Sequence, residues 1–266
     1  MSRSSKPNQN ARSSGRGMIL TFHKVQPQFS FGANNFPPSR IEKLLGFLQR
    51  RGFRFVPLEH AVLRGEPSDL AITFDDGYAH LADVLPNLMQ RYGVKPTVFI
   101  PTAFIGCDNT WDYSSSFQRT PHLSAAAIKE LAKLGVRFGA HGHRHLDLTR
   151  CNQMELVEEL KRPMKELENI LGETVSSISY PFGRVNETVT SQARSAGYRF
   201  GFTMSYPDPL ELPLAAGRLP IYGYDTTFSI RQKVEHGTFY AVERINSGIT
   251  NRLSGGTSWW RRLCGN

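Results

Sequence analysis

The stretch from Ala71 to Tyr78, AITFDDGY, constrains this chain more than any other. An apolar, β-branched run leads directly into two adjacent carboxylates, Asp75 and Asp76, and then into a glycine. Where a strand gives way to a loop, two neighbouring side chains can reach the same cavity. One carboxylate can then hold a cation while the other accepts protons. A surface Asp-Asp-Gly turn has the same composition, so this stretch alone leaves both interpretations open.

A histidine-rich stretch favours the first interpretation. Three of the five residues from His141 to His145 are histidines, and on a helical turn the first and the last would lie on one side. His143 would point away from that side, so we leave it out of the ligand set. Two imidazoles and one carboxylate, with a position left for water, are typical of a hydrolytic metal site. The alternative is a solvated loop that binds metal adventitiously, but the two stretches together indicate a metal centre.

The chain resembles the polysaccharide deacetylase family, also called the NodB-homology or carbohydrate esterase 4 group. The segments that match are Thr73-Phe74-Asp75-Asp76-Gly77 and His141-Gly142-His143-Arg144-His145. The resemblance implies an α/β fold, an incomplete or distorted (β/α) barrel. One position departs from the pattern, because Gly142 stands where the family usually has Ser or Thr, whose hydroxyl supports the loop.

The same resemblance assigns roles to residues in both segments. It implies that Asp76, His141 and His145 bind a divalent metal ion, for which we expect Zn²⁺, with Co²⁺ or Ni²⁺ as alternatives. It also implies that Asp75 is the general base. The resemblance is specific for these residues and looser for the catalytic acid and for the arginine that orients the base.

The catalytic acid is expected on the first strand. Met18 to Phe22 reads as a buried strand that ends at His23. A single histidine at a strand end is commonly structural. One branch of the family, however, has its motifs in a permuted order, with the acid histidine first, in a pattern like Leu-Thr-Tyr-His. Leu20-Thr21-Phe22-His23 is similar to that pattern, whereas His236 is a poorer candidate.

The family's third motif is matched only in part. Ser179-Tyr180-Pro181-Phe182 keeps the Pro-Phe half, and the resemblance implies that the backbone N–H of Phe182 stabilises an oxyanion. The family often has an arginine where Ser179 stands, and that arginine orients the base aspartate. We expect Arg218, in Gly-Arg-Leu-Pro, to supply the guanidinium from a later strand.

Repeated strand–helix units predict a parallel sheet. Met154 to Leu171 is the clearest amphipathic helix, and we expect Pro163 to kink it or to start a new segment. Ser124 is the predicted N-cap of the helix that follows it.

The net charge of +9 is concentrated at the ends of the chain. Residues 1–17 and 244–266 together hold eight basic residues and no acidic one, which leaves +1 for residues 18–243. We expect these ends to be disordered basic tails around one deacetylase domain at 18–243. A near-neutral body argues against nucleic acid as a partner. Weak contact of the tails with an anionic membrane surface stays open, against the alternative of two solvated ends.

These expectations combine into a metal-dependent hydrolase that removes acetyl groups from the N-acetylated sugars of a polysaccharide or oligosaccharide. Trp111 is a candidate to stack on the acetylated glycan. The alternatives are an O-acetyl esterase or a non-sugar amide hydrolase on the same site, a catalytically silent sugar-binding module, and an interaction protein built on the tails.

The sequence also gives an expectation about location. No apolar segment of the secretory type precedes Met18. Three scattered cysteines do not make a disulfide framework, and they fit a reducing compartment. We therefore expect the protein in the cytoplasm, or at the cytoplasmic face of a membrane.

Overall fold

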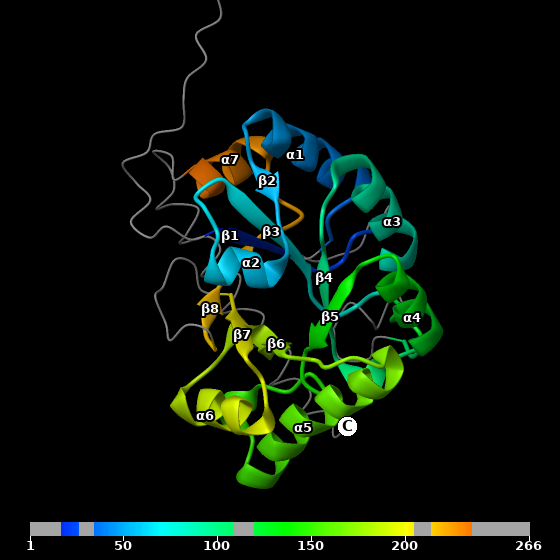
Figure 1. The fold of residues 1–266 in the computed structure, drawn as a ribbon, viewed down its shortest axis with the longest axis vertical. Helices are drawn as coiled ribbons and strands as arrows, with labels where there is room; N and C mark the ends of the chain where they lie inside the picture. The colour runs from blue at the N-terminus through cyan, green and yellow to red at the C-terminus, as the bar shows by residue number, and fades with distance from the viewer. Residues whose placement is uncertain (1–16, 27–34, 109–119, 205–213, 236–266) are drawn as a thin grey trace, which may run out of the picture.

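The computed structural model of the 266-residue chain describes residues 17–26, 35–108, 120–204 and 214–235. Within these residues nine strands form one parallel sheet, in the order β8-β7-β6-β5-β4-β3-β1-β9, with β2 paired to β3. Helices surround the sheet on its outer side (Figure 1).

The strands and helices have the following bounds. The strands are β1 (Met18–Phe22), β2 (Arg54–Phe55), β3 (Asp69–Phe74), β4 (Thr97–Ile100), β5 (Arg137–Ala140), β6 (Ser177–Ser179), β7 (Phe200–Thr203), β8 (Ala216–Gly217) and β9 (Leu219–Pro220). The α-helices are α1 (Pro38–Arg50), α2 (Leu58–Leu63), α3 (Leu81–Tyr92), α4 (Ala125–Lys133), α5 (Gln153–Leu171), α6 (Glu187–Ala196) and α7 (Thr227–Glu235). Short 3₁₀ turns are η2 (Thr102–Phe104), η4 (Leu148–Arg150) and η5 (Pro181–Gly183).

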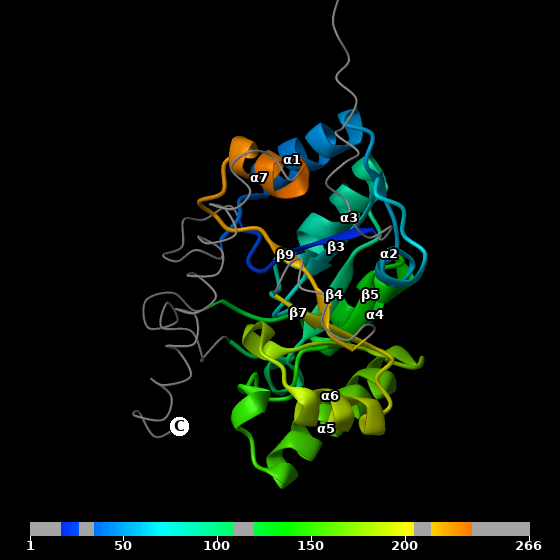
Figure 2. The ribbon, with the colours of Figure 1, turned by 90° about the vertical axis from the view of Figure 1, so that its left-hand side faces the viewer.

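The two strands at the ends of the sheet follow one another directly in the chain, so the sheet has to curve until its ends lie close together. β8 and β9 lie at opposite ends of the strand order, yet Arg218 is the single residue between them. β8 pairs with β7, and β9 pairs with β1 on the other side. The sheet is therefore nearly closed into a barrel with flanking helices, which confirms the predicted fold class (Figure 2).

The side chains that point into the barrel form an apolar layer, and further along the same strands they belong to the candidate site. β1 and β3 are buried along their whole length, and their register pairs Ile19 with Ala71. Both of these residues belong to an inner apolar cluster. Because side chains alternate along a strand, counting by two from them reaches His23 and Asp75 at the carboxyl ends of the strands. The strand period thus directs these two side chains inward.

The helices follow their sequence signals with one correction. Ser124 caps α4 and accepts a hydrogen bond from the N–H of Ala127, as predicted. α5 runs from Gln153 to Leu171 as one element, so of the two expectations for Pro163 the start of a new segment is wrong, and the kink stays a prediction. A proline removes only one i→i−4 bond, and the neighbouring bonds of a long helix continue past it. No helix within the described ranges is long and apolar enough to cross a membrane.

Several predictions lie outside the described residues. These are residues 1–16 of the first tail, the whole second tail at 244–266, Trp111 and His236. The domain boundaries therefore stay predictions.

Candidate metal centre

The predicted site residues gather at the carboxyl ends of four strands. β1 leads to His23, β3 to Asp75 and Asp76, and β5 to His141. β6 leads into the turn that holds Phe182. Because all four strands are parallel, their carboxyl ends meet at one edge of the barrel, where enzymes of this architecture place their active sites.

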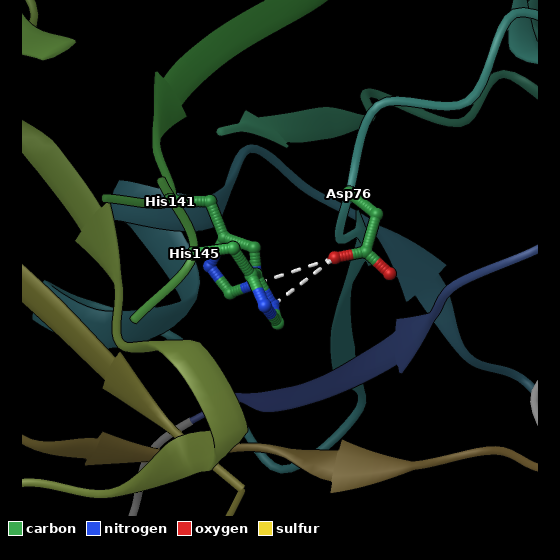
Figure 3. Close-up of side chains that lie close together, drawn as sticks. All are labelled: Asp76, His141 and His145. Carbon is green, nitrogen blue, oxygen red and sulfur yellow. Dashed lines mark ion pairs between the residues drawn. The ribbon is translucent and has the colours of Figure 1, made fainter. Parts of the chain in front are cut away.

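Asp76, His141 and His145 form a buried group that can hold a divalent metal ion, and their ligand atoms all lie within 4.8 Å of one another. Figure 3 shows the two imidazoles facing the carboxylate. Asp76 Oδ1 lies 3.5 Å from His141 Nε2 and 3.4 Å from His145 Nε2. Two atoms bound to one tetrahedral Zn²⁺ at about 2.1 Å lie about 3.4 Å apart. The spacing and the donor set therefore fit the expected metal, while the identity of the ion stays a prediction.

The imidazole of His141 is oriented by the next strand. Its Nδ1–H donates a hydrogen bond of 2.7 Å to the backbone carbonyl of Ser179, at the end of β6. A carbonyl oxygen only accepts, so Nδ1 carries a proton, and Nε2 is the nitrogen of this ring that can bind a metal ion. Metal-binding histidines are commonly oriented in this way.

Several residues at this edge have strained backbone conformations and lie close together. In the described part of the chain the non-glycine residues with positive φ are Asp76 at 68°, His145 at 56° and Phe182 at 60°. Such conformations cost free energy and persist where the surrounding structure imposes them, often at functional sites. Two of the three are members of the metal-binding group, and the third lies beside it.

The turn from His141 to His145 is not helical, so that part of the sequence interpretation is wrong. Gly142 has a φ of 70° and His145 one of 56°, values that no α-helix contains. The two imidazoles still converge, with ring centroids 4.8 Å apart. His143 lies apart from the metal-binding group, because its Nδ1 is 2.9 Å from Thr102 Oγ1.

Asp75 is held by Arg218, the contact anticipated from the sequence. Arg218 is fully buried; its Nη1 donates to Asp75 Oδ1 and its Nη2 to Asp75 Oδ2, both at 2.7 Å. The same Nη2 donates to the hydroxyl of Ser179 at 2.7 Å. Burial raises the pKa of Asp75, but the Arg218 guanidinium more than offsets it, helped by the neighbouring histidines, and lowers that pKa to about 2. Asp75 is therefore ionised at ordinary pH.

His23 and Phe182 lie close to the group. His23 follows Phe22, whose backbone carbonyl accepts a hydrogen bond of 2.8 Å from the N–H of Asp75, so the histidine lies next to the pair of carboxylates. Its Nδ1 is buried and has no hydrogen-bond partner within the described ranges. The ring of Phe182 lies edge-on to that of His145, with centroids 4.8 Å apart.

Two further residues contact the site, and the sequence did not mark either of them. His122 donates from Nδ1 to the backbone carbonyl of Asp76 at 2.7 Å, and its ring stacks on Tyr78. Glu159, on α5, accepts hydrogen bonds from the backbone of the histidine turn. Both contacts join segments far apart in the chain, so no local motif announces them.

Known relatives match much of this chain. The profile of the polysaccharide deacetylase family matches residues 64–201. The Bacillus subtilis (strain 168) protein YxkH, which carries the name polysaccharide deacetylase, is 28% identical over 192 residues, or 70% of this chain and 63% of that protein. The poly-beta-1,6-N-acetyl-D-glucosamine N-deacetylase of Staphylococcus aureus (strain MRSA252) is 25% identical over 142 residues, or 50% of this chain and 47% of that protein. The chain thus spans less than two thirds of the length of these relatives.

A solved structure shares the fold. The Streptococcus pyogenes deacetylase PplD gives a TM-score of 0.68 at 20% sequence identity, covering 82% of this chain and 98% of that one. Identity at this level shows the fold alone. The family profile, by contrast, covers just over half of the sequence, and the chain therefore belongs to the polysaccharide deacetylase family.

Proposed function

We propose that the protein is a metal-dependent hydrolase that removes acetyl groups from the N-acetylated sugars of a polysaccharide or oligosaccharide. The observation that carries the proposal is the separation of two adjacent carboxylates, in which Asp76 faces two imidazoles and Asp75 is clamped by Arg218. The name of the Staphylococcus aureus relative points to polymers of N-acetylglucosamine as the first substrate class to test.

The reaction needs a water nucleophile, a base and an acid. Asp76, His141 and His145 would hold a divalent ion, with Zn²⁺ expected before Co²⁺ or Ni²⁺, and when bound this ion would acidify a water molecule and polarise the acetyl carbonyl. Asp75 accepts a proton from the attacking water. Arg218 holds Asp75 in place and keeps it ionised until then.

The remaining residues act on the tetrahedral intermediate. The backbone N–H of Phe182 donates a hydrogen bond to the oxyanion. This bond stabilises the transition state, in which the negative charge on the oxygen develops. His23 gives a proton to the amide nitrogen as the C–N bond breaks, because an unprotonated amine is a very poor leaving group. The products are acetate and a free amino sugar.

Acetate release from N-acetylglucosamine oligomers tests this function. The wild-type protein is compared with Asp75→Asn, each with zinc, with cobalt and with a chelator. We expect metal-dependent release that falls by about 10²–10⁴-fold in the variant, the usual contribution of a general base. Zinc binding by Asp75→Asn is the control, since this variant keeps all three ligands.

Two results would contradict the proposal. Release that survives both the chelator and Asp75→Asn would remove the metal and the base from the mechanism. Release from O-acetylated glycans alone would replace the amide reaction with the esterase alternative on the same residues.

A further inference from the structure

Two of the three candidate metal ligands lie on a turn that neither a helix nor a strand fixes. β5 ends at Ala140, and the next regular element is η4, which begins at Leu148. Between them the backbone has a positive φ at Gly142 and again at His145. Such a turn keeps its shape only if its own backbone N–H groups are bound by something else.

The carboxylate of Glu159 binds these N–H groups. Its Oε2 accepts hydrogen bonds from the N–H of His143 at 2.9 Å and from the N–H of Arg144 at 3.0 Å. Its Oε1 accepts one from Arg144 Nε at 2.8 Å. Successive backbone N–H groups that converge on one anion form a concave anion-binding site, and hydrogen bonds to a carboxylate are stronger than neutral ones.

The burial of Glu159 separates this contact from an ordinary surface ion pair. Glu159 has no exposed surface, while the side chain of its partner Arg144 is 43% exposed. A fully buried carboxylate is costly unless its oxygens are well satisfied. Here two of its donors are the peptide groups between His141 and His145, so the free energy of this contact depends on the shape of the turn.

Gly142 shows how closely the carboxylate fits the turn. A Cβ atom built at this position would lie 3.1 Å from Glu159 Oε2 and 3.4 Å from Pro181 Cγ. Its φ of 70° also disfavours any side chain. The turn, the start of η5 and the carboxylate are therefore packed closely, and a side chain at position 142 would require its neighbours to shift by a few tenths of an ångström.

We propose that Glu159 is a positioning residue for the metal centre: from α5, its carboxylate fixes the turn so that His141 and His145 present Nε2 to the same ion. This inference rests on the proposed metal-dependent function. The bonds that Glu159 makes to the N–H groups of His143 and Arg144 act on the backbone between the two ligands.

Zinc affinity of the metal-free protein, measured by competition with a chromophoric chelator, tests the inference. In Glu159→Gln the bonds to the two N–H groups lose the negative charge of their acceptor, and with the amide oxygen in the place of Oε2 the amide NH₂ faces another donor, Arg144 Nε. We expect the Kd for Zn²⁺ to rise by about 10-fold to 100-fold, the usual effect of losing a partner that orients metal ligands. Glu158→Gln is the matched control, because Glu158 is the adjacent residue on α5 and is half exposed; its Kd should stay within about twofold of wild type.

Glu159→Asp protects the test against a folding failure. It keeps the charge but withdraws the carboxylate by one methylene, and we expect an intermediate rise in Kd. The unfolding midpoint of each metal-free variant is measured alongside. If Glu159→Gln does not fold, Glu159→Asp decides the outcome.

The outcomes are distinct. A lower unfolding midpoint with wild-type zinc affinity would mean that Glu159 is merely structural, and it would overturn the inference. A wild-type protein that binds no zinc would overturn the proposed function and this inference with it. Weaker zinc binding in the Glu159 variants, with Glu158→Gln unchanged, supports both.

Discussion

Asp75 and Asp76 are adjacent in the chain but face different cations. Asp75 continues the inward face of β3, where Arg218 donates to both of its oxygens at 2.7 Å. Asp76 has a φ of 68°, and its carboxylate lies against Nε2 of His141 and of His145. Because a cation of the chain already satisfies Asp75, Asp76 is the carboxylate left for an added ion.

Replacing Arg218 by glutamine should destabilise the protein and reduce kcat. Both partners of the ion pair are buried, and removing one partner of such a pair costs about 3–5 kcal/mol. The free energy of unfolding, from urea denaturation of metal-free protein, measures this loss. The same substitution made in an Asp75→Asn background should cost less, because no buried charge is then left unpaired. An equal cost in the two backgrounds would contradict the assigned pairing.

The same variant should change how stability depends on pH. The pKa of Asp75 is lowered from 3.8 to about 2 in the folded protein, so its contribution to stability is present above the unfolded value and is lost as pH falls through the folded one. Without the guanidinium, burial raises this pKa. Arg218→Gln should therefore show a stability deficit, relative to wild type, that shrinks as the unfolding titration is carried into the acid range, because the wild type loses the contribution of its ionised Asp75 while protonation of Asp75 in the folded variant removes the unpaired buried charge.

At the scale of elements, helix α5 carries both an N-terminal capping box and a residue that contacts the candidate site. It begins with a capping box, in which Asn152 accepts from the N–H of Glu155 and the Glu155 side chain accepts from the N–H of Asn152. Two turns further along the same helix, Glu159 reaches the histidine turn. The start of this helix therefore helps to set where that carboxylate lies.

Asn152→Ala should lower the free energy of unfolding by about 1 kcal/mol, because the first turn of α5 loses its cap. Urea denaturation measures the change, with Gln153→Ala as the control, since Gln153 is exposed at the next position and makes no cap. If the two variants were equally stable, the capping box would have no energetic role.

The sequence was sufficient for those elements whose signals are local. The strand before Asp75, the Ser124 cap and the helix ending at Leu171 all follow from apolar period and cap chemistry. The histidine turn was misjudged as helical, because spacing by four fits a helix and a tight turn with positive φ equally well. Glu159 was missed, because its bonds to the turn span 15 and 16 residues and depend on how α5 packs.

At the scale of the whole molecule, barrel closure and the candidate site share a residue. Arg218 alone separates β8 from β9, the two ends of the strand order, and its buried side chain reaches Asp75 at the end of β3. The guanidinium also lies 5.3 Å from the ring centroid of Phe99, inside the barrel. The inner apolar layer thus supports the polar network above it, and all groups of the proposed mechanism emerge from one edge.

The position of zinc in a crystal grown with stoichiometric Zn²⁺, located by anomalous diffraction at the zinc absorption edge, tests the central claim most directly. We predict one ion at the barrel edge, bound by Nε2 of His141, Nε2 of His145 and the carboxylate of Asp76, with His143 turned away. Zinc bound elsewhere, zinc bound through His143 in place of either ligand, or no zinc at all would contradict the account.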